Sequence, residues 1–464
     1  MQECAETIEL DPGLIRRFDR NGPRYTSYPT ADRFVEAYDG AAHAAWLERR
    51  EIGGFARPLS LYVHLPFCAS LCYYCACNKV ITRDHGRSAK YLRYLEKELR
   101  LLLPHLRGSR QITQLHLGGG TPTFLSHEEL RHLAAMLRAH FDFAPDGEYA
   151  IEIDPRTVDE ATIALLAELG FNRMSLGVQD HDPAVQEAIH RIQPAALTHA
   201  TLDAARRHGF GSVNFDLIYG LPRQSVASFD RTLDDVLDCR PERIALYSYA
   251  HLPARFKPQR RIADHIMPGA QQKLDIFMLA HRRLLDAGYV HVGMDHFALP
   301  EDELAQALHS GRLHRNFQGY TTQAECDLLA LGVSAISKIG PAYSQNLHGL
   351  DDYYDSLDQG RLPVARGIES TPDDLARRAV IMALMCQGEV ALEAIETAHL
   401  LDFRSYFAAE LERLEEFEQA GLLEMEEGWL RVTPQGRYFL RGISMVFDAY
   451  LQNAQSRAQF SRLI

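Results

Sequence analysis

Residues 64–79 read HLPFCASLCYYCACNK, and this stretch concentrates the sulfur chemistry of the chain. Four of the eight cysteines fall within ten residues there, with the spacing C-x3-C-x2-C-x-C. They are Cys68, Cys72, Cys75 and Cys77, whereas Cys4, Cys239, Cys326 and Cys386 are scattered. In a reducing compartment, clustered cysteines are more often metal ligands or catalytic groups than disulfides. The stretch therefore predicts a metal centre or a reactive thiol.

Two kinds of metal site compete for this spacing. Structural zinc sites usually pair two ligand knuckles that a longer span separates, and the sequence has no second knuckle. Three closely spaced thiolates suit a cubane iron–sulfur cluster, which takes thiolates on its irons. If three cysteines bind three irons, the fourth iron stays open to a small chelating ligand and can pass it an electron. Reductive cleavage of S-adenosylmethionine (SAM) needs that arrangement, in which Cys77 is surplus. Zinc and a ligand-free role stay open as alternatives.

The bulk composition is that of an ordinary globular protein, with 46% hydrophobic and 24% charged residues among 464. The net charge of −13 argues against general binding to nucleic acid or acidic membranes, where a basic face is expected. The opening MQECAETIELDPG lacks a signal-peptide pattern, and no apolar run approaches the ~18 residues that span a bilayer. We therefore expect a cytoplasmic protein with no nucleic-acid or membrane partner.

Short β-branched or aromatic stretches alternate with helix-length segments along much of the chain. Such alternation with short connections predicts parallel strands in βαβ units. Six or seven units indicate an α/β barrel, closed or partial, with a doubly wound open sheet as the main competitor. The predicted strands are 59–65, 112–117, 148–153, 173–178, 212–218, 243–249 and 289–294, and the predicted helices are 89–103, 127–141, 159–170 and 229–239.

The pattern changes after about residue 360. Residues 366–386 predict a helix with a Thr-Pro start, and residues 407–443 predict a helix, a hairpin around EEGW and another helix. This order resembles a winged-helix arrangement, but its acidic balance and missing basic stripe argue against DNA binding. The predicted division is an N-terminal segment over 1–55, a barrel over 56–360 and a mainly helical C-terminal domain over 361–464.

Other chemistry-bearing residues gather where predicted strands end. The three glycines of LGGGTPT (117–123) let a ligand touch the backbone, although a plain strand–helix turn has the same appearance. The carboxyl ends of strands form the active-site face of a βα barrel. We therefore expect a site at this face, although each carboxylate alone is equally typical of a helix cap or an ion pair. The polar residues in question are Glu152 and Asp154, Gln179, Asp216, and Asp295 with His296.

At this point the chain resembles the radical SAM superfamily. Cys68, Cys72 and Cys75 match its C-x3-C-x2-C signature in a loop after the first predicted strand, and LGGGTPT resembles its motif at the methionine amino group. Over essentially its whole length the chain resembles one family, the oxygen-independent coproporphyrinogen III oxidases. The stretches that carry this likeness are GPRYTSYPT (22–30), YVHLPFC (62–68), CACNK (75–79), FDLIYGLP (215–222), YAHLP (249–253), GMDHFA (293–298), HRNFQGYTTQ (314–323) and the final QFSRLI.

The resemblance implies a partial (βα)6 TIM-like barrel of the radical SAM type, with an N-terminal extension, a [4Fe-4S] cluster and two SAM molecules. It implies anaerobic oxidative decarboxylation of the ring A and B propionates of coproporphyrinogen III to vinyl groups, giving protoporphyrinogen IX for heme biosynthesis. A 5'-deoxyadenosyl radical from SAM removes a hydrogen from the propionate β-carbon, and loss of CO2 and one electron leaves the vinyl. An electron donor such as flavodoxin or ferredoxin, and a monomeric state, are implied as well.

The resemblance also implies roles for individual residues. Glu152 is expected to hold the amino or ribose end of SAM, and Arg191 its carboxylate. The substrate propionates need local cations, for which Arg24 and Arg315 are candidates, although both are equally typical of surface arginines. Cys77, Tyr62 and Glu152 are expected to be catalytic, with Cys77 as a hydrogen-bonding or proton-handling thiol. A small buried side chain is the alternative for Cys77, and core packing is the equal alternative for Tyr74. The implied sets are Cys68, Cys72 and Cys75 for the cluster; Tyr62, Tyr74, Gly119, Glu152 and Ile336 for the first SAM; and Gly120, Thr121, Gln179, Arg191, Asp216 and Ala250 for the second.

Three other functions stay open. One is a heme-binding chaperone of the same superfamily, but those relatives lack the counterpart of Cys77 and the RYTSYP segment, and this chain has both. The second is a radical SAM methyl transferase or cyclopropanase of the related class. The third is a zinc-stabilised interaction protein, which iron and sulfide analysis of anaerobically purified protein would distinguish.

Overall fold

The computed structural model describes residues 11–18, 20–51, 57–323 and 326–451. Cys4 and the final QFSRLI, which the sequence analysis used, lie outside these residues. The chain divides into two compact units. The first, which we call the barrel unit, comprises Arg33–Lys273 and Glu325–Glu369; the second, the C-terminal unit, comprises Leu274–Ala324 and Ser370–Ile464 together with the residues up to Asp32.

This division differs from the predicted segments because two stretches pack with distant parts of the chain. Buried Arg50 donates from Nε to Asp327 Oδ2 at 2.8 Å, which joins part of the predicted N-terminal segment to the barrel unit. The Tyr320 hydroxyl donates to Met385 O at 3.0 Å, which joins the stretch 274–324 to the C-terminal unit. Pairings over such sequence distances leave no local signal in the residue pattern.

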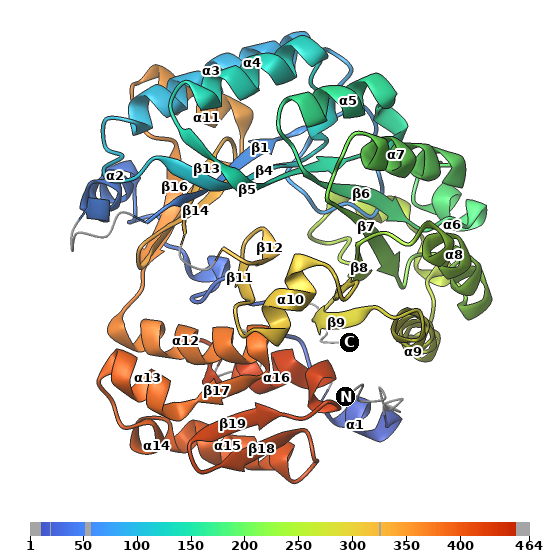
Figure 1. The fold of residues 1–464 in the computed structure, drawn as a ribbon, viewed down its shortest axis with the longest axis vertical. Helices are drawn as coiled ribbons and strands as arrows, with labels where there is room; N and C mark the ends of the chain where they lie inside the picture. The colour runs from blue at the N-terminus through green and yellow to red at the C-terminus, as the bar shows by residue number, and fades with distance from the viewer. Residues whose placement is uncertain (1–10, 19, 52–56, 324–325, 452–464) are drawn as a thin grey trace. The chain divides into compact units, whose positions relative to one another are not determined.

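A twisted sheet forms the centre of the barrel unit (Figure 1). Its strands from β13 to β8 are all parallel. The βαβ pattern predicted β1 and β4 to β8, but no predicted strand covered β13. Beyond β13 the sheet continues through strands that pair antiparallel and that the sequence analysis did not predict. The order is β16 (Val364–Glu369), β15 (Ala342–Asn346), β14 (Ile336–Ile339), β13 (Asp327–Leu331), β1 (Leu59–Leu65), β4 (Gln111–Gly119), β5 (Asp142–Ile153), β6 (Arg173–Gln179), β7 (Ser212–Tyr219) and β8 (Arg243–Ser248).

Helices line the outer face of this sheet (Figure 1). Their apolar residues recur at helical spacing and are buried, as in α4, where Leu130, Leu133 and Leu137 face the core. Ser126 and Glu129 form the predicted capping box at the start of α4. The helices of the barrel unit include α2 (Gly40–Glu48), α3 (Gly86–Leu102), α4 (His127–Arg138), α5 (Glu160–Glu168), α6 (Pro183–Ala188), α7 (Ala195–Arg207), α8 (Val226–Cys239) and α11 (Leu350–Asp358).

Strand β1 lies in the middle of the sheet and is buried on both faces, as parallel strands under helices are. Tyr62 is its one partly exposed residue. The chain leaves β1 into the cysteine loop, which the short parallel pair β2 (Phe67–Cys68) and β3 (Val80–Ile81) closes at its base. The cysteines therefore begin at the carboxyl end of a rigid, fully covered strand.

A buried carboxylate ties α3 to the strands beyond β13. Glu98 is 2% exposed and accepts three hydrogen bonds. The donors are Gly332 N at 2.8 Å, the Tyr353 hydroxyl at 2.7 Å and Asn346 Nδ2 at 2.6 Å. Burial raises the pKa of Glu98 to about 7, although these three donors oppose the rise. The network holds the turn after β13 and the end of β15 against one helix.

The C-terminal unit contains the predicted helix, hairpin and helix, and Thr371 caps the predicted helix α12 (Pro372–Gln387). The predicted strand at 289–294 is in part wrong: β9 pairs antiparallel with β10 and does not continue the parallel repeat. No described helix is long and apolar enough to cross a membrane. The elements include α1 (Pro12–Phe18), α9 (Ala270–Asp286), which begins in the barrel unit, β9 (Val290–Gly293), β10 (His296–Ala298), α10 (Glu303–His309), β11 (His314–Asn316), β12 (Gly319–Thr321), α12 (Pro372–Gln387), β17 (Glu389–Ala391), α13 (Leu392–His399), α14 (Phe403–Tyr406), α15 (Ala408–Glu418), β18 (Leu423–Glu426), β19 (Trp429–Val432) and α16 (Leu440–Ser444).

Candidate active site

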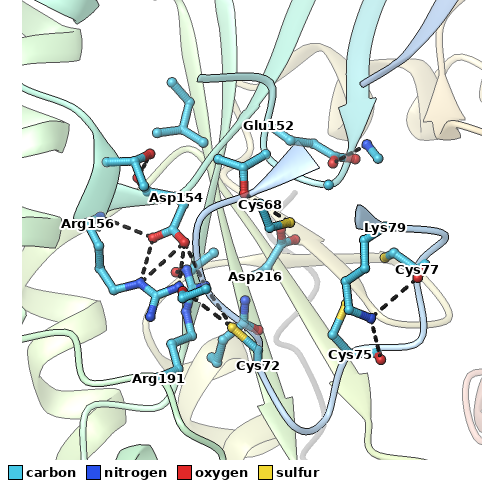
Figure 2. A pocket seen from close by; sticks show the side chains of 18 of the residues that line it. Cys68, Cys72, Cys75, Cys77, Lys79, Glu152, Asp154, Arg156, Arg191 and Asp216 are labelled. Atoms are coloured by element: carbon cyan, nitrogen blue, oxygen red, sulfur yellow. Dashed lines mark hydrogen bonds and ion pairs between the residues drawn. The ribbon is translucent and has the colours of Figure 1, made fainter. Parts of the chain in front are cut away.

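A cavity of about 300 Å³ lies in the barrel unit at the carboxyl ends of the parallel strands (Figure 2). The cysteine loop after β1, the glycines after β4 and side chains from β5 to β8 line it. Most of the residues predicted for the site therefore share one cavity. Those that line it are Cys68, Cys72, Tyr74, Cys75, Cys77, Gly119, Gly120, Thr121, Glu152, Gln179, Arg191 and Asp216.

The thiols of the loop have distinct surroundings. The Thr121 hydroxyl donates to Cys68 Sγ at 3.5 Å. A hydrogen bond from Cys77 lowers the pKa of Cys75 to about 6 and raises the pKa of Cys77 itself. Lys79 Nζ donates to Cys75 O at 2.9 Å, so the ammonium reinforces the negative charge on that side of the loop. Burial raises the pKa of Cys68 to about 11, so this thiol needs a coordinated cation in order to ionise.

Two arginines, Arg156 and Arg191, approach the thiol of Cys72 (Figure 2). Arg156 Nη2 lies 3.6 Å from Cys72 Sγ, and Arg191 Nη1 lies 3.7 Å from it. Asp154 holds both guanidinium groups, at 2.6 Å from Arg156 Nη2 and 3.1 Å from Arg191 Nη1. Burial acts to raise the pKa of Asp154, but the two arginines hold it below its ordinary value. One carboxylate between two guanidinium groups leaves a net positive charge beside Cys72, which favours a thiolate or an anionic ligand.

The glycine turn at the end of β4 contacts both a site carboxylate and the chain that leads into the cysteine loop. Gly119 N donates to Glu152 Oε2 at 3.0 Å, and its φ of +116° is in a region that side chains rarely adopt. A Cβ at Gly119 would lie 2.6 Å from the His64 ring, and a Cβ at Gly120 would lie 2.7 Å from Pro66 O. The turn therefore fits closely against the start of the cysteine loop, which a side chain would push away.

Glu152 lies at the end of β5 with 43% of its side chain exposed in the cavity. Its Oε1 lies 3.2 Å from His116 Nε2. Burial acts to raise the pKa of Glu152, but His116 and the Gly119 N–H hold it below the ordinary value. The carboxylate is therefore charged near neutral pH and available to a cationic ligand. Tyr62 lies beside it, with its ring stacked 5.8 Å from that of His116, although it does not line the cavity.

Asp216 contributes a second carboxylate from β7. It accepts from Ser175 Oγ and Asn214 Nδ2, both at 2.8 Å. Burial first, and then the charge of Glu152, raise the pKa of Asp216 to about 6. Among the carboxylates that line the cavity, Glu152 and Asp154 therefore stay ionised in mild acid, whereas Asp216 takes up a proton there.

Comparisons with known proteins agree with the cysteine loop and the strand-end residues of this cavity. The chain matches the radical SAM superfamily over residues 62–236 and the HemN C-terminal domain over residues 370–439. It is 51% identical over 461 residues to the oxygen-independent coproporphyrinogen III oxidase of Pseudomonas aeruginosa, covering 99% of this chain and 100% of that protein. The chain belongs to the oxygen-independent coproporphyrinogen III oxidases. The corresponding protein of Escherichia coli is 45% identical over 460 residues, covering 99% of this chain and 100% of that one.

A solved structure extends the likeness to the fold. Coproporphyrinogen III oxidase (HemN) from Escherichia coli, described as a radical SAM enzyme, superposes with a TM-score of 0.91 at 44% identity, covering 96% of this chain and 100% of that one. The predicted radical SAM α/β fold with a helical C-terminal region is therefore confirmed. Radical SAM enzymes use a [4Fe-4S] cluster and SAM, and membership in this oxidase family brings both cofactors to the chain.

The donor set in the cavity fits such a cluster better than a single ion. Among the described residues, no three His, Cys, Asp or Glu side chains lie close enough to bind one metal ion. A zinc ion needs four ligands around a single centre, whereas a cubane spreads its thiolates over separate irons. Three cysteines that line one cavity without meeting at a point satisfy the second requirement and not the first.

Besides Tyr62, two residues of the predicted SAM sets lie apart from the cavity lining. Ala250 follows β8, and its carbonyl accepts from Gln259 Nε2 at 3.3 Å. Ile336 begins β14 and pairs with Gln345 of β15. Both belong to the barrel unit, but neither is among the described residues that line the cavity.

The two arginines proposed for the propionates lie in the C-terminal unit and differ in their surroundings. Arg24 already forms an ion pair with Asp295. Arg315 is 5% exposed, with its guanidinium 4.6 Å from the Tyr320 ring centroid. Its Nε and Nη1 have no hydrogen-bond partner among the described residues. The alternative that Arg315 is a surface arginine is therefore wrong.

The sequence analysis did not single out Arg156, Ser175 or His116. Each acts on a predicted residue from a neighbouring strand or turn: Arg156 on Cys72, Ser175 on Asp216 and His116 on Glu152. The position of Arg156 two residues after Asp154 at a strand end was a usable signal. Ser175 and His116 lie within strands, where the sequence gives no reason to choose them.

Proposed function

We propose that this protein converts the ring A and ring B propionates of coproporphyrinogen III to vinyl groups without oxygen, giving protoporphyrinogen IX. The observation that carries the proposal is the cavity itself. It combines the three-cysteine loop, the glycine turn and two carboxylates at strand ends, in a chain whose relatives share the name of this activity over their full length. Each propionate loses CO2, one hydrogen atom and one electron in the process.

We propose that Cys68, Cys72 and Cys75 hold the cluster. When bound, the cluster and SAM supply the one-electron chemistry that removes a hydrogen from the propionate β-carbon. The protein contributes the positive charge of Arg156 and Arg191 at Cys72 and the Lys79 ammonium near Cys75, which stabilise the thiolates. A fourth protein thiolate would close the iron that SAM needs, so Cys77 is excluded from this set.

The cavity residues orient SAM through its charged ends. Glu152 is ionised and exposed in the cavity, which suits the amino group or the ribose hydroxyls of SAM. Arg191 uses Nη1 for Asp154 and Nη2 for Gly177 O, while its buried Nε has no partner among the described residues. An unused buried donor on a guanidinium supports a carboxylate ligand at this position.

The second SAM is a separate part of the proposal. Gly120, Thr121, Gln179, Arg191 and Asp216 line the same cavity as Tyr74, Gly119 and Glu152 of the first set. Gln179 has a φ of 66°, and strained backbone of this kind is frequent at ligand sites. Two carboxylates on different strands, at Glu152 and Asp216, support two separately bound ligands.

For the substrate carboxylates we propose Arg315 ahead of Arg24. A buried guanidinium whose donors are unused is costly unless an anion binds it. Arg315 meets that description, whereas Arg24 is already neutralised by Asp295.

Cys77 is proposed to handle a proton or a hydrogen bond near the reacting groups. Its side chain is exposed and lines the cavity, and the hydrogen bond with Cys75 raises the pKa of its thiol. A flavodoxin or ferredoxin as electron donor, a monomeric state and a cytoplasmic location complete the proposal.

The test is anaerobic incubation of reconstituted protein with SAM, dithionite and coproporphyrinogen III, followed by product mass measurement. We expect two CO2 and two 5'-deoxyadenosine per protoporphyrinogen, and we expect air to abolish the activity. Protein that cleaves SAM and never decarboxylates the substrate would refute the assignment. Heme binding without turnover would support the chaperone instead.

A further inference from the structure

A short basic segment follows β8 and stands out on an acidic protein. Residues 254–261 read ARFKPQRR, in a chain whose net charge is −13. Its four cations are all exposed, and none forms an ion pair with any described residue. The nearest acidic residue along the chain, Asp264, pairs with His251. The four cations are Arg255, Lys257, Arg260 and Arg261.

Hydrogen bonds join this basic segment to the cysteine loop. Gln259 lies within it, is buried, and donates from Nε2 to Tyr74 O at 3.0 Å. Arg261 donates to the Tyr73 hydroxyl at 3.3 Å and lies 5.3 Å from the centroid of its ring. Tyr73 and Tyr74 are the two residues between Cys72 and Cys75. The segment that carries the exposed cations therefore contacts the stretch proposed to hold the cluster, through Gln259 and Arg261.

Tyr73, which contacts Arg261, lies beside further aromatic and apolar side chains. The Tyr73 ring stacks on that of exposed His190, with 4.8 Å between centroids and 6° between planes. Ile192, two residues further along, is 60% exposed. Arg191, between them in sequence, contacts Cys72. An apolar centre beside a charged rim is the usual anatomy of a protein–protein interface.

We infer that this surface, made of Tyr73, His190, Ile192, Arg255, Lys257, Arg260 and Arg261, docks an acidic, low-potential electron carrier of the flavodoxin or ferredoxin class. The inference rests on the proposed function, which requires one electron for each SAM cleaved. The carrier loses that electron and the cluster gains it, with no bond made or broken between the two proteins. Docking here puts only the loop itself between the carrier and the cluster thiolates.

Charge favours this partner over others. Acidic carriers are attracted to an unpaired basic patch, and such complementarity raises the association rate most at low salt. The same cations could instead attract the carboxylates of the tetrapyrrole. The two partners are separable, because a substrate role affects turnover with any reductant and a docking role affects turnover with the protein carrier alone.

The test uses the double variant Arg255→Glu/Lys257→Glu in the reconstituted full chain. Neither residue is among the described residues that line the cavity. The matched control is Arg93→Glu/Arg110→Glu, which makes the same charge change at two exposed arginines on and after α3. Turnover is measured with dithionite and, separately, with a reduced bacterial flavodoxin at low and high salt. Binding of oxidised flavodoxin is measured by calorimetric titration.

We expect the double variant to keep the dithionite rate while its apparent KM and Kd for flavodoxin rise by about tenfold or more at low salt. The wild-type rate with flavodoxin should fall with salt, and the control should behave as wild type. Unchanged flavodoxin binding in the variant overturns the inference, as does an equal loss with both reductants. If wild-type protein binds flavodoxin and cleaves SAM but never decarboxylates substrate, the proposed function fails while the docking surface stands.

Discussion

Replacing Glu98 by glutamine tests whether this buried carboxyl makes the stability of the protein depend on pH. In the folded chain burial raises its pKa from 4.5 to about 7. A raised carboxyl pKa means that the folded state binds the proton more tightly, so the proton stabilises the fold at low pH. That contribution is lost as the pH rises through about 7.

The magnitude follows from the two pKa values. One pKa unit corresponds to about 1.4 kcal/mol, and integrating between pH 5 and pH 8 gives a loss of about 2.5 kcal/mol in unfolding free energy. Glutamine cannot titrate, and its amide would face the Nδ2 donor of Asn346. Glu98→Gln should therefore be less stable than wild type at pH 5, by about 1–3 kcal/mol for the lost bond. The deficit should shrink by about 2.5 kcal/mol by pH 8.

Urea unfolding followed by circular dichroism at several pH values, with refolding checked, measures this difference. Glu96→Gln is the control, because Glu96 lies two residues away on the same helix in a partly exposed ion pair with Arg100. Its effect should stay small and independent of pH. A wild-type minus Glu98→Gln difference that stays constant between pH 5 and pH 8 would show that Glu98 is ionised throughout and that the reasoning is wrong.

Three further predictions concern the site. Cys75→Ser should lose or degrade the cluster, as measured by Mössbauer and EPR spectroscopy. Cys77→Ser should keep a four-iron cluster that binds SAM but should form little product. Equal cluster loss in both variants would contradict the three-ligand set. Because the pKa of Asp216 is raised to about 6, SAM-dependent turnover should fall as the pH drops through 6. Asp216→Asn should flatten that part of the pH profile. An unchanged profile in the variant would show that the Asp216 carboxyl does not cause the fall in turnover. Arg315→Gln should raise the KM for substrate by about tenfold or more, as expected when one charge-assisted contact is lost, with smaller effects for Arg24→Gln; the reverse order would refute the preference.

Local patterns predicted the parallel part of the fold well. Strand β1 has the predicted bounds, Leu59–Leu65, and the capping box at Ser126 begins α4 as expected. These elements depend on residue periodicity and on caps, both of which a short window of sequence contains. Parallel strand β13 and the antiparallel strands β14 to β16 were not predicted. The place of β13 depends on pairing with β1, about 270 residues earlier in the sequence, and β14 to β16 extend the sheet from it.

In the candidate site too, residues that act through long-range pairing were not predictable from local sequence. The cysteines, glycines and carboxylates were recognisable because they end strands or repeat at a characteristic spacing. Arg156 and His116 act across strands, on Cys72 and Glu152, and only the folded sheet brings them there. Arg315 was recognised by its motif, but its burial without a partner depends on packing that the sequence does not reveal.

The position of β13 has a consequence for how the protein is made. Strand β1 is paired on one side by β4, but its other neighbour begins at Asp327, about 270 residues after Leu59. A ribosome adding ~5–20 residues per second needs roughly 15 to 50 seconds to cover that interval. Throughout it the nascent β1 keeps an open edge, whose free N–H and C=O groups can pair with another chain. A messenger that ends before codon 327 would leave that edge permanently unpaired, so we expect such products to aggregate even though the cysteine loop and the glycine turn are complete.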